Sequence, residues 1–279
     1  VEFVYKRNFK YSAYFKTLPK LLGTKGDFSI KMAVCGNVFA TGQHGFSHTD
    51  ALSKTEALQA LNQHITRLQN DKVFNKLFSA VLLKEFWKNN TSKHSILQQE
   101  HYHEFEIDVN MVLAIDGHWQ SFEAYVEGLK AKYRTRVNSV IKKSRDLKLK
   151  SLNAQEILEH SEIIMQLYDN VLQHSDYTYG VLSPETFSAF KEKLGDTFTF
   201  TAAYKDNSMI GFSTAFFNGT VMEANYVGLD YKYNTSFAVY QRLLYHFLEQ
   251  AIAAQCTELQ LGRTSELIKS ALGAKPKAM

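Results

Sequence analysis

The residues best suited to chemistry lie in the last quarter of the chain. Glu223 is a carboxylate in an otherwise apolar, strand-like segment, where a charged side chain is uncommon. Tyr226 follows on the same segment, and Tyr240 lies in the helical segment after it. A carboxylate can take a proton from an attacking amine, and a tyrosine hydroxyl can protonate a leaving group. These residues are therefore candidates for general acid–base work, with Glu223 as base and Tyr226 or Tyr240 as acid.

Each of these residues also has a structural explanation. Strand residues alternate between the two faces of a sheet, so Glu223 could simply point outward. The same alternation predicts that Tyr226 faces away from Glu223. With 15 tyrosines in the chain, core packing accounts equally well for Tyr226 and Tyr240.

A short polar turn is predicted at Lys232–Ser236, after this strand and before an amphipathic helix predicted over Ser236–Ala254. The first N–H groups of a helix are unpaired and lie at the positive end of its dipole, so they suit an anion. We expect the phosphates of an acyl carrier to meet Lys232 and the backbone of Asn234, Thr235 and Ser236. Because these are also good capping residues, an ordinary capped helix start is the alternative.

Arg263 and Lys269 follow the final predicted strand, Thr257–Leu261. Ligands often bind where strands end, and the planar guanidinium of Arg263 suits a carboxylate or phosphate. We expect this pair to bind substrate. A surface ion pair with Glu266 is the alternative.

A helix predicted from about Ser121 to Leu147 carries an unusual concentration of positive charge. Between Lys130 and Lys150, Asp146 is the only acid among nine basic residues, which are Lys130, Lys132, Arg134, Arg136, Lys142, Lys143, Arg145, Lys148 and Lys150. Such a face could meet tRNA, an anionic lipid headgroup or a polyanionic glycan precursor. An ordinary solvated helix face is the alternative.

Composition limits the class of protein. The chain has 279 residues, 45% of them hydrophobic and 22% charged, with a net charge of +4, which is typical of a folded soluble protein. Its two cysteines are far apart and predict a reducing, cytoplasmic setting. No apolar run approaches the length of a membrane span. No zinc-like ligand spacing is present, so we expect no metal.

The order of predicted elements places the sequence in the α+β class. Two helical segments precede three strands, which are followed by a helix and a final strand. The three strands are predicted at Thr197–Tyr204, Met209–Asn218 and Thr220–Val227, with hairpin turns between them. The chain opens at Val1 inside a strand-like segment, so we expect its first domain to lack a beginning.

This element order resembles the GNAT acyl-CoA N-acyltransferase fold, and more narrowly the FemAB-like acyltransferases. The resemblance rests on four segments: KYRTRVNSVIKKSR, MIGFSTAFFN, VGLDYKYN and LGRTSELIKSALGAKP. It implies two tandem GNAT-like domains with mixed sheets flanked by helices, a partial one at 1–118 and an acyltransferase domain at 119–279. The usual phosphate-binding signature departs from the family pattern here, since its turn has a single glycine, Gly228.

The resemblance implies acyl transfer, with acetyl-CoA or another acyl-CoA as the leading donor and a small or peptide-like amine as acceptor. An aminoacyl-tRNA-dependent transferase of the Fem type, acting on a cell-wall precursor, is the first alternative. A catalytically silent binding module is the second. CoA binding and RNA-dependent activity would distinguish the three.

Overall fold

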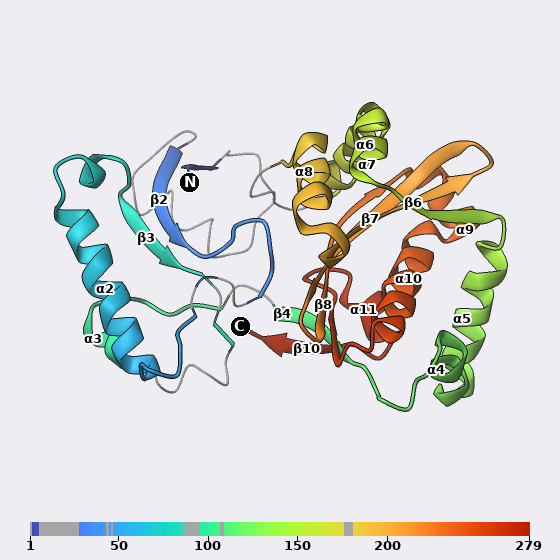
Figure 1. Ribbon diagram of the computed structural model, residues 1–279, viewed down its shortest axis with the longest axis horizontal. Coiled ribbons are helices and arrows are strands. Elements are labelled where there is room, and N and C mark those ends of the chain that lie inside the picture. The colour runs from blue at the N-terminus through green and yellow to red at the C-terminus, as the bar shows by residue number, and fades with distance from the viewer. Residues whose placement is uncertain are drawn as a thin grey trace. The chain divides into compact units, whose positions relative to one another are not determined.

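The computed structural model describes residues 2–5, 28–42, 45, 47–84, 86–87, 95–106, 109–175 and 181–279 (Figure 1). By their contacts the described residues divide into two compact units. The N-terminal unit holds the described residues up to 106 together with Ala278 and Met279, and the C-terminal unit holds 109–175 and 181–277. Each unit is described by itself.

The N-terminal unit contains a three-stranded sheet in the order β1-β2-β3. β1 is antiparallel to β2, and β2 is parallel to β3. The longest helix, α2, begins at a capping box in which Ser53 and Glu56 exchange hydrogen bonds, as the Ser-x-x-Glu spacing predicts. The elements are β1 (Glu2–Tyr5), β2 (Phe28–Cys35), α2 (Lys54–Asn70), η1 (Phe74–Lys76), β3 (Ala80–Leu83) and α3 (Ser95–Gln99).

The C-terminal unit is built on a seven-stranded mixed sheet in the order β10-β4-β9-β8-β7-β6-β5. β5 to β8 form an antiparallel meander, and β9 returns parallel to β8 after a helical crossover. The strands are β4 (Val109–Ala114), β5 (Leu147–Ser151), β6 (Phe198–Lys205), β7 (Ser208–Asn218), β8 (Val221–Leu229), β9 (Glu258–Gln260) and β10 (Lys275–Ala278). The predicted α+β class and the mixed sheet are therefore confirmed.

Helices cover both faces of this sheet (Figure 1). One face carries an aromatic-rich core centred on Phe187, Phe200 and Phe212, which packs under α6 to α8. The other face packs under α10, α4 and α5, with Met222 and Leu259 contributed by the strands. The helices are α4 (Phe122–Gly128), α5 (Ala131–Lys143), α6 (Ala154–Glu159), α7 (Ser161–Gln173), α8 (Pro184–Leu194), η3 (Gly195–Thr197), α9 (Tyr231–Phe237), α10 (Val239–Ala253) and α11 (Glu266–Ser270).

The single helix predicted over Ser121–Leu147 was wrong. α4 ends at Gly128, a poor helix former, and Lys130 is extended (ψ 144°) before α5 begins. The chain then leaves the helix after Lys143 and enters β5, an edge strand whose Leu147 and Leu149 pack against the core on the α10 side.

The segment between β8 and α10 also differs from prediction. Lys232–Ser236 is not a turn but part of the short helix α9, which Asp230 caps by accepting a hydrogen bond from the N–H of Lys232. Ala238 then adopts a left-handed conformation (φ 50°), and α10 begins at Val239. The short helix α9 therefore replaces the predicted turn, and the long helix begins at Val239 rather than at Ser236.

Candidate functional site

The sheet of the C-terminal unit opens between β8 and β9. The two strands pair only through Val221, Met222 and Glu223, whose partners on β9 end at Gln260. Within the described residues, β8 continues to Leu229 with β7 alone as its neighbour. A strand that loses one partner presents backbone N–H groups on that side, and such groups can polarise a carbonyl.

Glu223 lies at the point where the strands separate. It is half-buried, opposite Phe216 of β7 and Gln260 of β9. Residues directly opposite share a face of the sheet, so Glu223 lies on the face covered by α6 to α8, together with Phe216. The carboxylate thus stands beside the first unpaired stretch of β8.

Two buried amide side chains, Gln260 of β9 and Asn110 of β4, lie on the next two strands of the sheet beyond Glu223. Asn110 of β4 donates a hydrogen bond from its Nδ2 to Oε1 of Gln260 at 3.1 Å, and Gln260 donates from its Nε2 to Glu258 at 2.7 Å. The Oδ1 atom of Asn110 is buried and has no hydrogen-bond partner among the described residues. A buried acceptor of this kind suits a donor such as an amine.

Tyr226 lies on the same face as Glu223, contrary to simple alternation. A bulge in β8 places Asn225 and Tyr226 together against Thr214, whose Oγ1 accepts a hydrogen bond from the N–H of Tyr226. The Tyr226 ring packs edge-on against Tyr168 and Phe187, with ring centroids 5.8 and 5.6 Å apart. Burial raises the pKa of Tyr226 well above its ordinary value, so its hydroxyl stays protonated.

Tyr240 lies on the opposite face, at the start of α10. Burial raises the pKa of its hydroxyl, and a hydrogen bond with Ser265 partly opposes that rise. Ser265 belongs to the turn after β9, in which Gly262, Thr264 and Ser265 have positive φ angles of 71°, 62° and 51°. Side chains with a Cβ are strained in this region, so the turn is held by its surroundings.

Lys269 helps to stabilise this turn. Its side chain is buried, and its ammonium donates to the carbonyl oxygens of Gly262, at 3.3 Å, and of Arg263. The structure thus brings Arg263 and Lys269 together, with the Lys269 ammonium bound to backbone. Their role in substrate binding stays a prediction.

The residues predicted to bind an acyl carrier all belong to α9. Lys232, Thr235 and Ser236 are exposed, and the Oδ1 of Asn234 accepts a hydrogen bond from the N–H of Tyr240 at 2.9 Å. Asn234, Thr235 and Ser236 lie beyond the first turn of α9, where N–H groups bond within the helix. The Asn234 side chain therefore already accepts a hydrogen bond from one of the first N–H groups of α10, the groups that would otherwise face an anion. Binding of acyl-CoA here stays a prediction.

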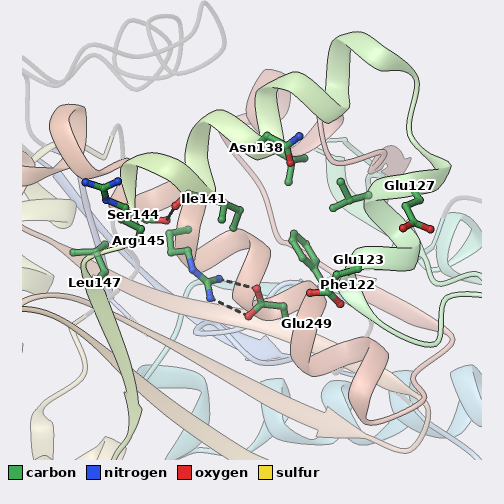
Figure 2. A pocket seen from close by; sticks show the side chains of 12 residues that line it. Phe122, Glu123, Glu127, Asn138, Ile141, Ser144, Arg145, Leu147 and Glu249 are labelled. Atoms are coloured by element: carbon green, nitrogen blue, oxygen red, sulfur yellow. Dashed lines mark hydrogen bonds and ion pairs between the residues drawn. The ribbon is translucent and has the colours of Figure 1, made fainter.

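A separate cavity of about 540 Å³ opens between α4, α5 and α10 (Figure 2). None of the predicted site residues lines it. Its walls combine apolar side chains with charged ones and comprise Phe122, Glu123, Val126, Glu127, Val137, Asn138, Ile141, Ser144, Arg145, Leu147, Arg242 and Glu249.

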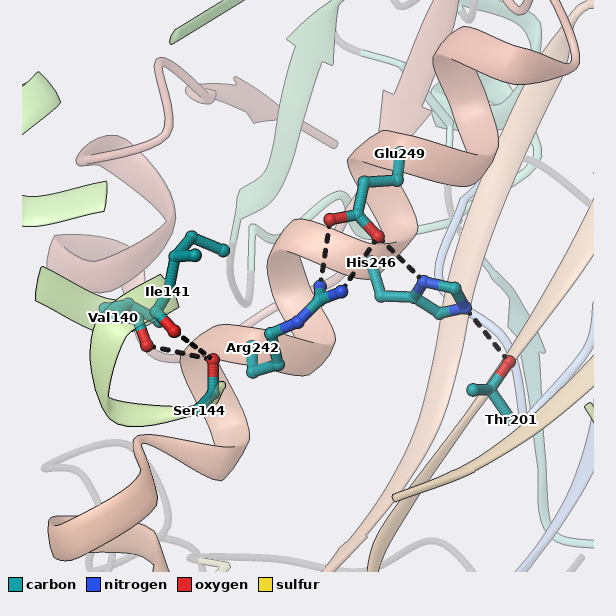
Figure 3. A network of polar contacts seen from close by, with 7 residues as sticks. All are labelled: Val140, Ile141, Ser144, Thr201, Arg242, His246 and Glu249. Carbon is teal, nitrogen blue, oxygen red and sulfur yellow. Dashed lines mark hydrogen bonds and ion pairs between the residues drawn. The ribbon is translucent and has the colours of Figure 1, made fainter. Parts of the chain in front are cut away.

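An ion-pair network on α10 borders this cavity (Figure 3). Arg242 meets both carboxylate oxygens of Glu249, at 3.0 and 3.2 Å, and Nδ1 of His246 lies 3.0 Å from the same carboxylate. Nε2 of His246 lies 3.4 Å from the buried Thr201 hydroxyl. Sequence analysis missed this network, although Arg242, His246 and Glu249 recur at the i, i+4, i+7 spacing of one helix face.

Two kinds of feature are absent from the described residues. In that part of the chain, no helix is both long enough and apolar enough to cross a lipid bilayer. Within the same residues, no group of three or more His, Cys, Asp or Glu side chains is placed to hold a metal ion.

The fold is that of the FemAB-like proteins, a GNAT-type acyltransferase fold. FemX superposes with a TM-score of 0.57 at 9% identity, covering 90% of this chain and 79% of FemX. L-PGS from Bacillus licheniformis gives 0.56 at 9% identity, covering 90% and 78%. The C-terminal domain of a candidate lysylphosphatidylglycerol synthetase from Agrobacterium fabrum gives 0.55 at 11% identity, covering 81% and 72%.

No family model matches the sequence, and no curated protein matches it. At these low identities the superpositions show the fold, while the chemistry of this chain has to be argued from its own residues.

Proposed function

We propose that the C-terminal unit is an aminoacyl transferase, which moves an aminoacyl group from aminoacyl-tRNA to an amine acceptor. The observation that supports this most directly is the separation of β8 from β9 immediately after Glu223. FemX and L-PGS, whose fold this chain shares, are aminoacyl transferases.

We assign the residues separate roles from their positions around the open edge of β8. Tyr226 donates its N–H toward β7, so alternation turns the N–H of Val227 toward the side that β9 has left. We propose that the acyl carbonyl binds there and is polarised by this group. The amine approaches on the face of Glu223, where the unpartnered Oδ1 of Asn110 can accept one of its N–H bonds.

In the reaction, the amine nitrogen forms a bond to the acyl carbonyl carbon, and Glu223 takes the proton that the nitrogen loses. The bond from that carbon to the ribose oxygen breaks, and the oxygen takes a proton from a tyrosine hydroxyl. Tyr240 is the better candidate for this acid, because Tyr226 is held among aromatic rings. Both residues recover their starting protonation from solvent.

The choice of donor rests on the start of α10. In acyl-CoA enzymes an anion meets free N–H groups at such a helix start. Here α9 precedes it, and the side chain of Asn234 already accepts from the N–H of Tyr240. An aminoacyl ester carried by tRNA does not require an anion-binding site at the start of this helix.

Transfer of an acetyl or other acyl group from acyl-CoA is the second candidate. The same open strand edge favours it, since a thioester carbonyl could bind there, and the exposed Lys232 could meet a phosphate. A non-catalytic binding module is a third reading, in line with the incomplete phosphate signature.

Calorimetric titration with CoA and acetyl-CoA, with Lys232→Ala alongside, decides between the two donors. We expect no saturable binding at millimolar ligand. Micromolar binding that weakens in the variant would instead favour acyl-CoA as donor.

The chemistry is tested by Glu223→Gln. Unfractionated tRNA charged with labelled amino acids is mixed with the protein and a panel of lysine-containing peptides, and transfer of label to peptide is measured. Removing the base is expected to lower the rate roughly 10²- to 10⁴-fold. Glu266→Gln, at an exposed residue with the same charge change, serves as control and keeps wild-type activity. Equal rates for the two variants would exclude Glu223 as base.

A further inference from the structure

The exposed side of α5 carries a row of cations, which we call the α5 patch. It consists of Lys132, Arg136, Lys142 and Lys143, all exposed. The apolar residues of the same helix turn away from this side, because Val137 and Val140 are buried in the core of the unit. The patch is therefore a solvent-facing surface on a helix whose orientation is fixed by packing.

The charges of the patch are not neutralised internally. Among the described residues, no ion pair or side-chain hydrogen bond involves any of its four members, whereas nearby Lys150 is paired with Glu156 and Arg145 with Asp146. Lys132 and Arg136 stand four residues apart, where like charges on a helix repel. No acidic residue lies in the first turn, where one would be favourable. Lys132 and Arg136 are thus unfavourable to the helix by themselves, whereas Lys142 and Lys143 lie in its last turn, where cations are favourable.

The rest of the chain has the opposite charge balance. Residues 130–150 hold nine basic residues and one acidic residue, which leaves 23 basic and 27 acidic residues elsewhere. An anionic partner is therefore attracted to this region and repelled by the remainder of the molecule. Such asymmetry orients a polyanion before contact.

The chemistry of the patch favours a phosphate backbone over a lipid surface. A helix that inserts into a bilayer presents apolar side chains to it. On α5, Val137 and Val140 are buried, and the partly exposed Tyr133 and Ile141 lie on their side of the helix rather than among the cations. The exposed side instead interleaves the cations with Thr135 and Ser139, whose short polar side chains are also compatible with phosphate contacts.

We propose that the α5 patch is the docking surface for the phosphate backbone of an RNA, the body of the tRNA donor. This inference rests on the proposed function. α5 contacts α9, and α9 follows directly on β8, the strand whose edge is open. Lys232 on α9 is also exposed.

The test compares two double variants of the full chain with equal net charge. Lys132→Glu with Arg136→Glu reverses the patch, and Lys193→Glu with Lys275→Glu reverses two exposed lysines elsewhere in the C-terminal unit. Binding of labelled, unfractionated tRNA is measured by fluorescence anisotropy over a range of salt concentrations. Sedimentation with vesicles of equimolar phosphatidylglycerol and phosphatidylcholine is measured in parallel.

We expect the patch variant to bind tRNA about tenfold more weakly or worse, with a log–log salt slope shallower by about 2, one for each lost phosphate contact. The control variant retains wild-type binding. Equal losses in both variants, or no loss in either, would overturn the proposal. Vesicle binding that depends on the patch, without tRNA binding, would replace RNA by a lipid surface.

The outcome is independent of catalysis. Glu223→Gln is expected to bind tRNA like the wild type, because Glu223 lies outside the patch. If tRNA binds through the patch but no label reaches any peptide, the docking surface stands and the proposed reaction fails. The melting temperature of the patch variant is also measured, and since Lys132→Glu places an acid in the first turn of α5, we expect no loss of stability.

Discussion

Single charged residues of α10 show how a half-buried carboxylate is kept ionised. Burial by itself would raise the pKa of Glu249, but the hydrogen bond from His246 and the positive charge of Arg242 outweigh it, so that the net shift is downward. The ionised carboxylate thus holds two partners beside the cavity between α4, α5 and α10. Its charge contributes to stability as long as the group stays ionised.

Glu249→Gln is therefore expected to destabilise the chain by about 1–3 kcal/mol at neutral pH, since it leaves Arg242 without its counter-ion. A carboxylate with a lowered folded-state pKa contributes stability above its unfolded pKa of about 4.3, and this contribution is lost as the pH falls through the folded value. Urea unfolding of both proteins from pH 7 to pH 3 checks this. The gap is expected to close at the acid end; a gap independent of pH would refute the ionic explanation. Glu127→Gln, at an exposed carboxylate of the same cavity, is the control.

At the scale of elements, the pairing of β7 with β8 places the strand edge of the proposed site. Phe212 lies opposite Gly228, and its ring stacks on Phe200 with centroids 4.8 Å apart. A Cβ on Gly228 would lie 2.1 Å from that ring. Glycine is required here by close packing of a neighbouring side chain, just beyond the bulge at Tyr226.

Gly228→Ala is expected to destabilise the chain by about 1–3 kcal/mol, because the Phe212 ring has to leave its place in a packed core. Chemical denaturation measures the change. Gly117→Ala, where nothing lies within 4 Å, is the matched control and is expected to be neutral. Adding Phe212→Leu to Gly228→Ala is expected to recover part of the loss, and strictly additive effects would argue against the clash.

At the scale of the whole molecule, the three hydrophobic clusters found among the described residues all belong to the C-terminal unit. Their members run from Met111 on β4 to Ala274, just before β10. A unit with its own core is expected to fold by itself.

A chain that begins at Val109 is therefore expected to unfold in one cooperative thermal transition and to keep native circular dichroism. A broad, non-cooperative melt would show that the C-terminal unit depends on the rest of the chain. Because α5 belongs to this unit, the same fragment is expected to keep its ability to bind tRNA through the α5 patch.

Local sequence patterns determined much of the C-terminal unit. Alternation and turn residues predicted the β6–β8 meander, and helical spacing predicted most of α10, because these signals depend on neighbours along the chain. The α+β class followed from the order of elements. Glu223 could be chosen as a candidate base because a carboxylate in an apolar strand is unusual.

Tertiary structure decided which of these residues meet. The row from Asn110 through Gln260 to Glu223 joins strands far apart in sequence, the bulge in β8 brings Tyr226 to the face of Glu223, and α9 replaces the expected turn. A bulge and a left-handed residue such as Ala238 depend on packing against other elements, so local patterns do not reveal them. The sequence by itself determined the elements and the charges, and only the folded sheet decided where its two strands separate, because strand pairing is set by contacts between distant segments.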